Sequence, residues 1–266
     1  MDAWRLLPLE TSNAFANMAV DEAILEARIA GQVPNTLRFY RWKPSCVSIG
    51  KNQDPEAEIY LEACSQLGVD VTRRISGGGT VYHDYDGEVT YCVVAETSDL
   101  GTADITTVYA EIYEAIQAAL GLLGIAADFS SGDARNCPNM TVKGKKISGS
   151  SQAITRGAVL QHGTILRSVD FQKMFTLLKL RNASCTQAAD IASRKITSIE
   201  NELGHSISPE AIADVLAKGF GSALRVELEP GELTNSEMDL AARLCLEKYA
   251  AKDWVFHGKI PAQNSV

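Results

Sequence analysis

The chain has 266 residues, of which 45% are hydrophobic and 22% charged, with a formal net charge of −8 and a pI near 5.1. These values are typical of a globular domain, and they disfavour broad nucleic-acid or membrane surfaces, which need a basic face. No stretch approaches about eighteen consecutive apolar residues, and MDAWRLLPLE lacks the features of a signal peptide. We therefore expect one cytoplasmic domain over residues 1–266.

Helical spacing of apolar residues predicts helices over 14–30 and 104–123, each preceded by a polar residue that can cap it, and a short helix near 56–66. Alternating patterns predict strands at 35–42, 45–51, from 69 onward, 88–96, in a hairpin over 140–148 that turns at Lys143-Gly144, and at 159–168. Further helices are predicted at 170–180, 192–203, 208–220 and 235–251.

Strands thus fill the middle of the chain and helices cluster at both ends. This distribution favours an α+β fold with a mixed β-sheet flanked by helices over a doubly wound arrangement. The dinucleotide fingerprint, the P-loop, G-x-S-x-G and H-E-x-x-H are all missing from the sequence.

The six cysteines are scattered, with no C-x-x-C pair and no histidine at zinc spacing. This pattern disfavours a disulfide framework and a structural metal site, so we expect most of the cysteines to be reduced and buried. Cys137 differs because it follows a loop and precedes the lysine-rich hairpin. It is a candidate nucleophile, although an inert thiol fits the same position.

The first motif is RRISGGGTVYHD, residues 73–84. Its three glycines allow positive φ angles and can present successive N–H groups to an anion, and the arginines can bind phosphate or carboxylate. A tight turn with solvated arginines fits the spacing equally well. In His83-Asp84 the aspartate can orient or charge the histidine, or the pair can simply cap a turn.

The second motif is VKGKKISGSSQ, residues 142–152. A strand after the turn places Lys145 and Lys146 on opposite faces, so one of them faces inward. An inward ammonium needs an anionic partner, which favours a bound phosphate or acyl phosphate. A solvated edge hairpin protected by lysines is the alternative.

The third motif is LQHGTIL, residues 160–166, where Gln161, His162 and Gly163 interrupt an apolar strand. Polar groups inside a core strand require hydrogen-bonding partners. The histidine is therefore either a ligand-binding residue or a satisfied core residue.

Together, RRISGGGTVYHD, KGKKISGSSQ and VLQHGTIL, in this order, resemble the lipoate–protein ligase A family of the biotin/lipoate ligase superfamily. NMAVDEAIL, TLRFYRW before PSCVSIGKNQ, and EKYAAKDW support the resemblance, which spans residues from about 4 to 254. It implies an α+β catalytic domain whose mixed sheet is related to those of class II aminoacyl-tRNA synthetases and biotin ligases.

The resemblance also implies an activity. Ligases of this family join lipoate to AMP from Mg²⁺-ATP and then transfer the lipoyl group to a lysine of an acceptor. Their acceptors are the lipoyl domains of 2-oxoacid dehydrogenase E2 subunits and the glycine-cleavage H protein. Lys146 matches the lysine that contacts the acyl carbonyl and the α-phosphate, where it would stabilise developing charge.

The remaining residues that match the family's acyl-adenylate site are Arg74, Ser76, Gly77, Gly78, Gly79, His83, Gly149, Ser150, His162 and Gly163. One departure concerns an Asn-Asp pair that holds nucleotide and metal in typical ligases, because Pro138 and Asn139 occupy these positions here. Asn139 brings no negative charge to Mg²⁺. The accessory C-terminal domain of many bacterial ligases also has no counterpart, so a separate accessory subunit would have to supply it.

The same superfamily contains octanoyltransferases, which use no ATP and carry an octanoyl group from acyl-carrier protein on a cysteine. GEVTYCVV and AVLQHGTIL resemble that branch too, with Cys137 near the position of its nucleophile. The short spacing from Cys137 to Lys146 and the uninterrupted glycine run favour the ligase.

We therefore predict an ATP-dependent lipoate–protein ligase. An octanoyltransferase that uses Cys137 is the second hypothesis, and a lipoyl-domain binding protein without activity is the third. The sequence does not separate lipoate from octanoate, since apolar pockets distinguish such chains by only about 1–3 kcal/mol.

Overall fold

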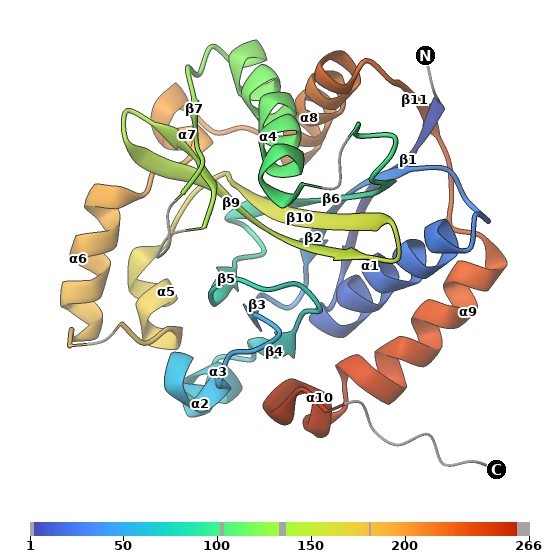
Figure 1. Ribbon diagram of the computed structural model, residues 1–266. Helices are drawn as coiled ribbons and strands as arrows, with labels where there is room; N and C mark the ends of the chain where they lie inside the picture. Colours follow the sequence, from blue (N-terminus) through green and yellow to red (C-terminus); the bar gives the residue numbers. More distant parts are fainter. Residues whose placement is uncertain (1–2, 102–103, 133–136, 181, 260–266) are drawn as a thin grey trace.

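The computed structural model describes residues 3–101, 104–132, 137–180 and 182–259, and it is built around a large mixed sheet with helices on both faces (Figure 1). The strand order is β11 (Glu227–Pro230), β1 (Ala3–Ser12), β2 (Thr36–Trp42), β6 (Glu88–Glu96), β10 (Ala158–Leu166), β9 (Lys145–Thr155), β8 (Asn139–Val142) and β7 (Asp128–Ser130). β1 pairs in parallel with β2 and β11, whereas the pairs from β2 to β7 are antiparallel. The α+β prediction is confirmed.

Alternating residues of the central strands face two hydrophobic cores. On one face, Ile165 of β10 packs in a core with α4 (Ile105–Leu122) and α8 (Pro209–Leu224). On the other face, Leu160 packs in a core with α1 (Ala14–Ile29) and α9 (Asn235–Leu244). The sheet is therefore the middle layer of three.

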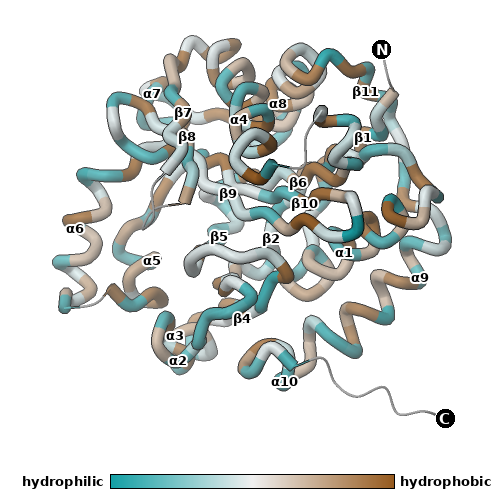
Figure 2. The backbone as a smooth tube through the Cα atoms, viewed as in Figure 1, coloured by the Kyte–Doolittle hydropathy of each residue, from teal (hydrophilic) through white to brown (hydrophobic). Residues whose placement is uncertain are grey.

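A second sheet lies beside the α1 face and contains β4 (Asp70–Arg73), β3 (Cys46–Ile49) and β5 (Val81–His83) in this order. Its small core includes residues of α3 (Leu61–Gln66) and α5 (Phe171–Leu177), and α2 (Pro55–Glu58) lies next to α3. The two strands predicted on either side of Lys43-Pro44 are both present, but they belong to different sheets. Figure 2 shows pale or hydrophilic backbone through much of β4 and β5. Residues of β3 and β5 line a cleft between the two sheets.

The prediction of one continuous helix over 192–203 is wrong, because two separate helices cover this segment. α6 (Cys185–Lys195) ends before Ile196, and α7 (Ile199–Leu203) begins after Ser198, whose side chain caps it. Between them Thr197 donates its N–H to the carbonyl of Lys146, so this segment pairs with β9 instead of continuing the helix.

Four elements were not predicted: the ten-residue strand β1, the short strands β7 and β11, and α10 (Lys252–His257). The helix predicted over 235–251 is α9 followed by a π-helical turn, Cys245–Tyr249. Within the described residues, no helix combines the length and apolar character required to cross a membrane.

Candidate functional site

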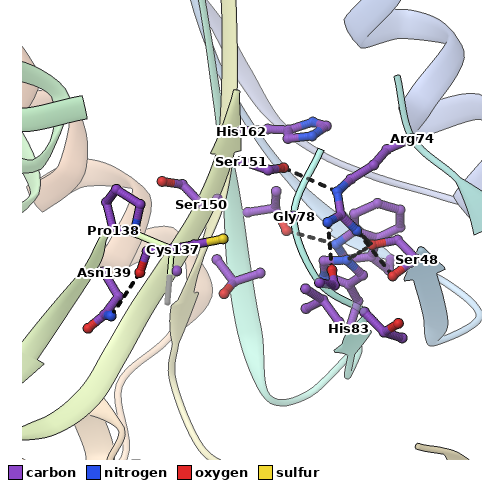
Figure 3. Close-up of a pocket in the computed structure, with 18 of the residues that line it drawn as sticks. Ser48, Arg74, Gly78, His83, Cys137, Pro138, Asn139, Ser150, Ser151 and His162 are labelled. Carbon is purple, nitrogen blue, oxygen red and sulfur yellow. Dashed lines mark hydrogen bonds between the residues drawn. The ribbon is translucent and has the colours of Figure 1, made fainter. Parts of the chain in front are cut away.

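A cleft of about 390 Å³ lies between the large and the small sheet, and all three sequence motifs reach it (Figure 3). Its walls come from β2, β3, β5, β6, β9 and β10, from the glycine loop (Gly77–Gly79) and from residues 137–139. The predicted residues that line it are Arg74, Gly78, Gly79, His83, Cys137, Asn139, Lys146, Gly149, Ser150, His162 and Gly163. Ser76 and Gly77 do not line the cleft: Ser76 is fully buried, whereas Gly77 is exposed.

Lys146 enters the cleft from the start of β9. A Cβ atom at Gly149 would lie 2.5 Å from its Nζ, so a glycine at 149 makes room for the ammonium group. By surface area Lys146 is exposed, and its side chain opens to the cleft. Desolvation by the protein atoms around the ammonium group lowers the pKa of Lys146; the negative charge of a Cys137 thiolate opposes the shift, and Arg74 adds to it.

The side chain of Lys146 has no hydrogen bond or ion pair with any residue in the described part of the chain. The anionic partner expected from the sequence is a bound phosphate or acyl phosphate, and no described carboxylate takes its place. The charge of Lys146 is available to a ligand in the cleft.

Cys137 is exposed and lines the same cleft. Figure 3 shows its sulfur pointing away from Pro138, toward the side of the cleft that holds the glycine loop. Its thiolate would act on the pKa of both Lys146 and Arg74, so the sulfur is within electrostatic reach of two cations. The four residues before Cys137 lie outside the described residues.

The other cysteines correct one expectation. All six are free, but only Cys46, Cys64 and Cys92 are buried, whereas Cys137 and Cys185 are exposed and Cys245 is intermediate. Burial raises the pKa of the Cys46 and Cys92 thiols well above its ordinary value, which keeps these thiols protonated.

Arg74 is only 4% exposed, and its guanidinium is bonded within the protein on every side. Nε donates to Ser151 Oγ at 3.1 Å, and Nη1 donates to the carbonyl and the hydroxyl of Ser48 at 3.2 and 3.1 Å. Nη2 donates to the carbonyls of Gly77 and Gly79 at 2.8 and 2.6 Å. Burial lowers the pKa of Arg74 to about 10, so the group stays charged at neutral pH.

His83 is held by Glu88 and not by Asp84, which corrects the prediction from the His83-Asp84 pair. Its Nδ1 lies 2.6 Å from Glu88 Oε1, its Nε2 lies 2.9 Å from Ser48 Oγ, and its ring stacks on Trp42. Asp84 instead forms an ion pair with Lys173 at 3.3 Å. Successive strand residues point to opposite faces, so the neighbour in sequence could not share the histidine's surroundings.

His162 sits between two polar partners in the core. Nδ1 lies 3.0 Å from Asp21 Oδ2, and Nε2 lies 2.7 Å from Ser76 Oγ. Burial lowers the pKa of His162, so the ring is neutral at neutral pH. The interpretation of His162 as a satisfied core residue is confirmed, and the ring also lines the cleft.

Asp21 does not line the cleft, but it is the main supporting residue of the site that the sequence motifs missed. Its carboxylate accepts from Arg38 at 2.7 Å and from Tyr40 at 2.8 Å, in addition to its contact with His162. Burial alone would raise the pKa of Asp21, but the hydrogen bond with His162 and the charge of Arg38 lower it overall. Asp21 belongs to the segment NMAVDEAIL, where a charged residue on the sheet-facing side of a helix was the available signal.

The donor set of the cleft does not suit a magnesium nucleotide. None of the described residues that line it is aspartate or glutamate, and Mg²⁺ sites in proteins normally use one or two carboxylates. Asn139, at the position expected to lie near nucleotide and metal, donates its amide to the carbonyl of Cys137 at 3.2 Å.

Comparisons with known proteins fit this geometry. Residues 13–221 match a family model described as the lipoyl protein ligase A/B catalytic domain. The chain is 37% identical to octanoyltransferase LipM of Kyrpidia tusciae and 34% identical to octanoyltransferase LipM of Clostridioides difficile, with 96% of this chain and 98% of each relative covered. Among solved structures, a bipartite lipoate protein ligase from Thermoplasma acidophilum aligns with a TM-score of 0.84 and 27% identity over 96% of this chain and 97% of that one.

These findings confirm the resemblance to the superfamily but overturn the predicted ligase activity. Both curated relatives are octanoyltransferases, which the sequence-based prediction had placed second. The prediction of ATP and Mg²⁺ as co-substrates depended on the ligase assignment. A solved lipoate–protein ligase A bound with ATP aligns at 28% identity, so ATP belongs to that structural relative.

Proposed function

This chain belongs to the lipoyl protein ligase A/B catalytic-domain family, and from that premise we propose that it is an octanoyltransferase that carries the octanoyl group on Cys137. The donor is octanoyl-acyl-carrier protein, and the final acceptor is a lysine of another protein. One observation carries the proposal: an exposed cysteine lines the same cleft as a lysine that has no bonding partner in the described residues. The octanoyltransferase relatives support the choice of acyl group and donor.

In the first half-reaction, the Cys137 thiolate attacks the carbonyl carbon of the octanoyl thioester. A C–S bond to Cys137 forms, and the C–S bond to the carrier thiol breaks. The departing thiolate takes a proton from the Lys146 ammonium, which leaves an acyl-cysteine and a neutral lysine. A cysteine suits this exchange because thiolates are strong nucleophiles and good leaving groups at neutral pH.

In the second half-reaction, the amine of the acceptor lysine attacks the acyl-cysteine carbonyl. The amide bond forms, Cys137 leaves as a thiolate, and Lys146 takes the proton that the attacking amine loses. Both groups return to their starting protonation states. The lowered pKa of Lys146 supports this role because a general acid and base must change its protonation state readily near neutral pH.

Lipoyl domains and the glycine-cleavage H protein are the acceptors that we propose, following the family resemblance. The ligase from Thermoplasma acidophilum is described together with its E2 lipoyl domain, which supports acceptors of this class. The six free cysteines suit a reducing compartment, so we propose the cytoplasm as the place of the reaction.

The test is intact mass spectrometry after incubation with octanoyl-acyl-carrier protein. We expect one octanoyl adduct per chain, released by hydroxylamine as a thioester is. The adduct should be absent from Cys137→Ser and present on Cys185→Ser, which removes the other exposed cysteine. A wild-type protein that gains no adduct, or an adduct that survives in Cys137→Ser, would rule out the proposed carrier.

A further inference from the structure

Of the two consecutive arginines in the first motif, Arg73 is the last residue of β4 and Arg74 follows it, and their side chains point in opposite directions. Arg73 donates to main-chain carbonyls of Trp254, Val255 and Phe256 on one side and of residues 50, 51 and 53 on the other. Arg74 points into the cleft wall. Neither guanidinium has an ion pair with a carboxylate of the described residues.

The five N–H groups of Arg74 match five acceptors, all of them in the protein. Two of these acceptors, the carbonyls of Gly77 and Gly79, come from the glycine loop and converge on the single atom Nη2. No donor of this arginine remains for a substrate anion while the loop is in this position. The buried guanidinium of Arg74 therefore binds the glycine loop.

Fixing the carbonyls also fixes the N–H groups that follow them. In a planar trans peptide the N–H points opposite to the carbonyl of the preceding residue. The N–H groups of Gly78 and Thr80 therefore point away from the guanidinium. Neither has an acceptor in the described residues, and both residues line the cleft.

The outer side of the loop is held as well. A Cβ atom at Gly50 would collide with the carbonyl oxygen of Gly78, so these two backbones are in direct contact. Next to them, Lys51 donates its N–H to the carbonyl of Ser76 at 2.9 Å. The glycine loop is thus held by hydrogen bonds from Arg74 and by backbone contacts with residues 50–51.

We propose that Arg74 is a positioning residue, which holds the glycine loop so that the N–H groups of Gly78 and Thr80 donate to carbonyl oxygens of the acyl thioester substrate. The identity of the substrate in this proposal rests on the proposed function. The hydrogen bonds that hold the loop do not depend on that function. The planar fork of arginine is required, because a lysine ammonium cannot reach Ser48, Ser151 and the two glycine carbonyls together.

The experiment compares Arg74→Lys, which keeps the charge, with Arg74→Gln, which removes it. We expect both to lower kcat/KM for octanoyl transfer by roughly ten- to a hundredfold, as expected for the loss of two hydrogen bonds. Alkylation of Cys137 by iodoacetamide should stay near the wild-type rate in Arg74→Lys, because this variant keeps the positive charge that acts on the thiolate. A lysine variant with wild-type kcat/KM would overturn the proposal, since charge alone would then suffice.

Hydrogen exchange gives a readout that does not depend on activity. The amide of Lys51 reports on the loop, because its acceptor is the carbonyl of Ser76, and we expect it to exchange at least about tenfold faster in Arg74→Lys. Amides of β6 and β10 should be unchanged, which shows that the fold persists. Unchanged exchange at Lys51 would overturn the proposed grip even if the protein transfers octanoyl groups.

A second variant reaches the loop from the other side with Arg74 intact. Gly50→Ala must displace the Gly78 carbonyl. We therefore expect it to lower kcat/KM and to speed hydrogen exchange at the Lys51 amide, as the Arg74 variants do. Gly121→Ala is the matched control, because its Cβ would meet no atom within 4 Å. If Gly50→Ala left both quantities at the values of the control, the proposal would be wrong.

Discussion

The two walls of the cleft differ in how their polar groups are bonded. On one wall, Arg74, His83 and His162 are buried, and the side chains of all three are bonded to protein partners. On the other wall, the side chains of Cys137 and Lys146 have no hydrogen bond to the described residues. The difference separates groups that hold the site in shape from groups that are free to bond to a substrate. It predicts different consequences for substitutions on the two walls.

The largest effect should come from the free wall. Lys146→Gln removes the proton donor and acceptor, so we expect the rate of octanoyl transfer in a single turnover to fall about 100- to 1,000-fold with little change in stability. Lys146→Arg keeps the charge but cannot readily release a proton, and it should be impaired to a similar degree. Near wild-type transfer by Lys146→Arg would show that the lysine supplies only charge.

A substitution behind the bonded wall, at the partner of His162, should lower stability instead. Asp21→Asn leaves Arg38 buried without its carboxylate, which should reduce the free energy of unfolding by about 3–5 kcal/mol. Urea denaturation is the measurement, with Asp214→Asn on the exposed face of α8 as the control. A loss below about 1 kcal/mol would mean that this network is not a structural support.

The smallest effect concerns pH. Burial lowers the pKa of His162 below its ordinary value of 6.5. Just below pH 6.5, the imidazole therefore binds a proton in the unfolded chain but stays neutral in the folded chain. The contribution of this residue to stability is complete above that pH and is lost as the pH falls. Between pH 7.5 and 5.5, the wild type should lose about 1 kcal/mol more than His162→Gln does. Equal losses in both proteins would contradict the neutral, buried state of the ring.

The sequence was sufficient to predict elements whose signals are local. The helix at 14–29, the strand at 158–166 and the hairpin turning at Lys143-Gly144 all follow from periodicity and turn residues over a few positions. β11 is short and its partner β1 lies at the other end of the chain, so no local pattern reveals it. The same holds for the contact between Asp21 and His162, which joins residues 141 positions apart.

The choice between ligase and transferase failed for a similar reason. The spacing from Cys137 to Lys146 was judged along the chain, but β8 and β9 pair as a hairpin and bring both residues to one cleft. Likewise, the uninterrupted glycine run favoured the ligase in the sequence, whereas in the structure the carbonyls of Gly77 and Gly79 accept hydrogen bonds from the guanidinium of Arg74. Motif spacing therefore identified the site but not its chemistry.

The most direct test of the central claim is to isolate the octanoylated protein, add a lipoyl domain without ATP, and follow the octanoyl group by mass spectrometry. The account predicts that the group leaves Cys137 and appears on the acceptor lysine in equal amounts, at a rate that matches steady-state turnover. An octanoyl group that stays on the enzyme, or an acceptor that is modified equally well by Cys137→Ser, would contradict it.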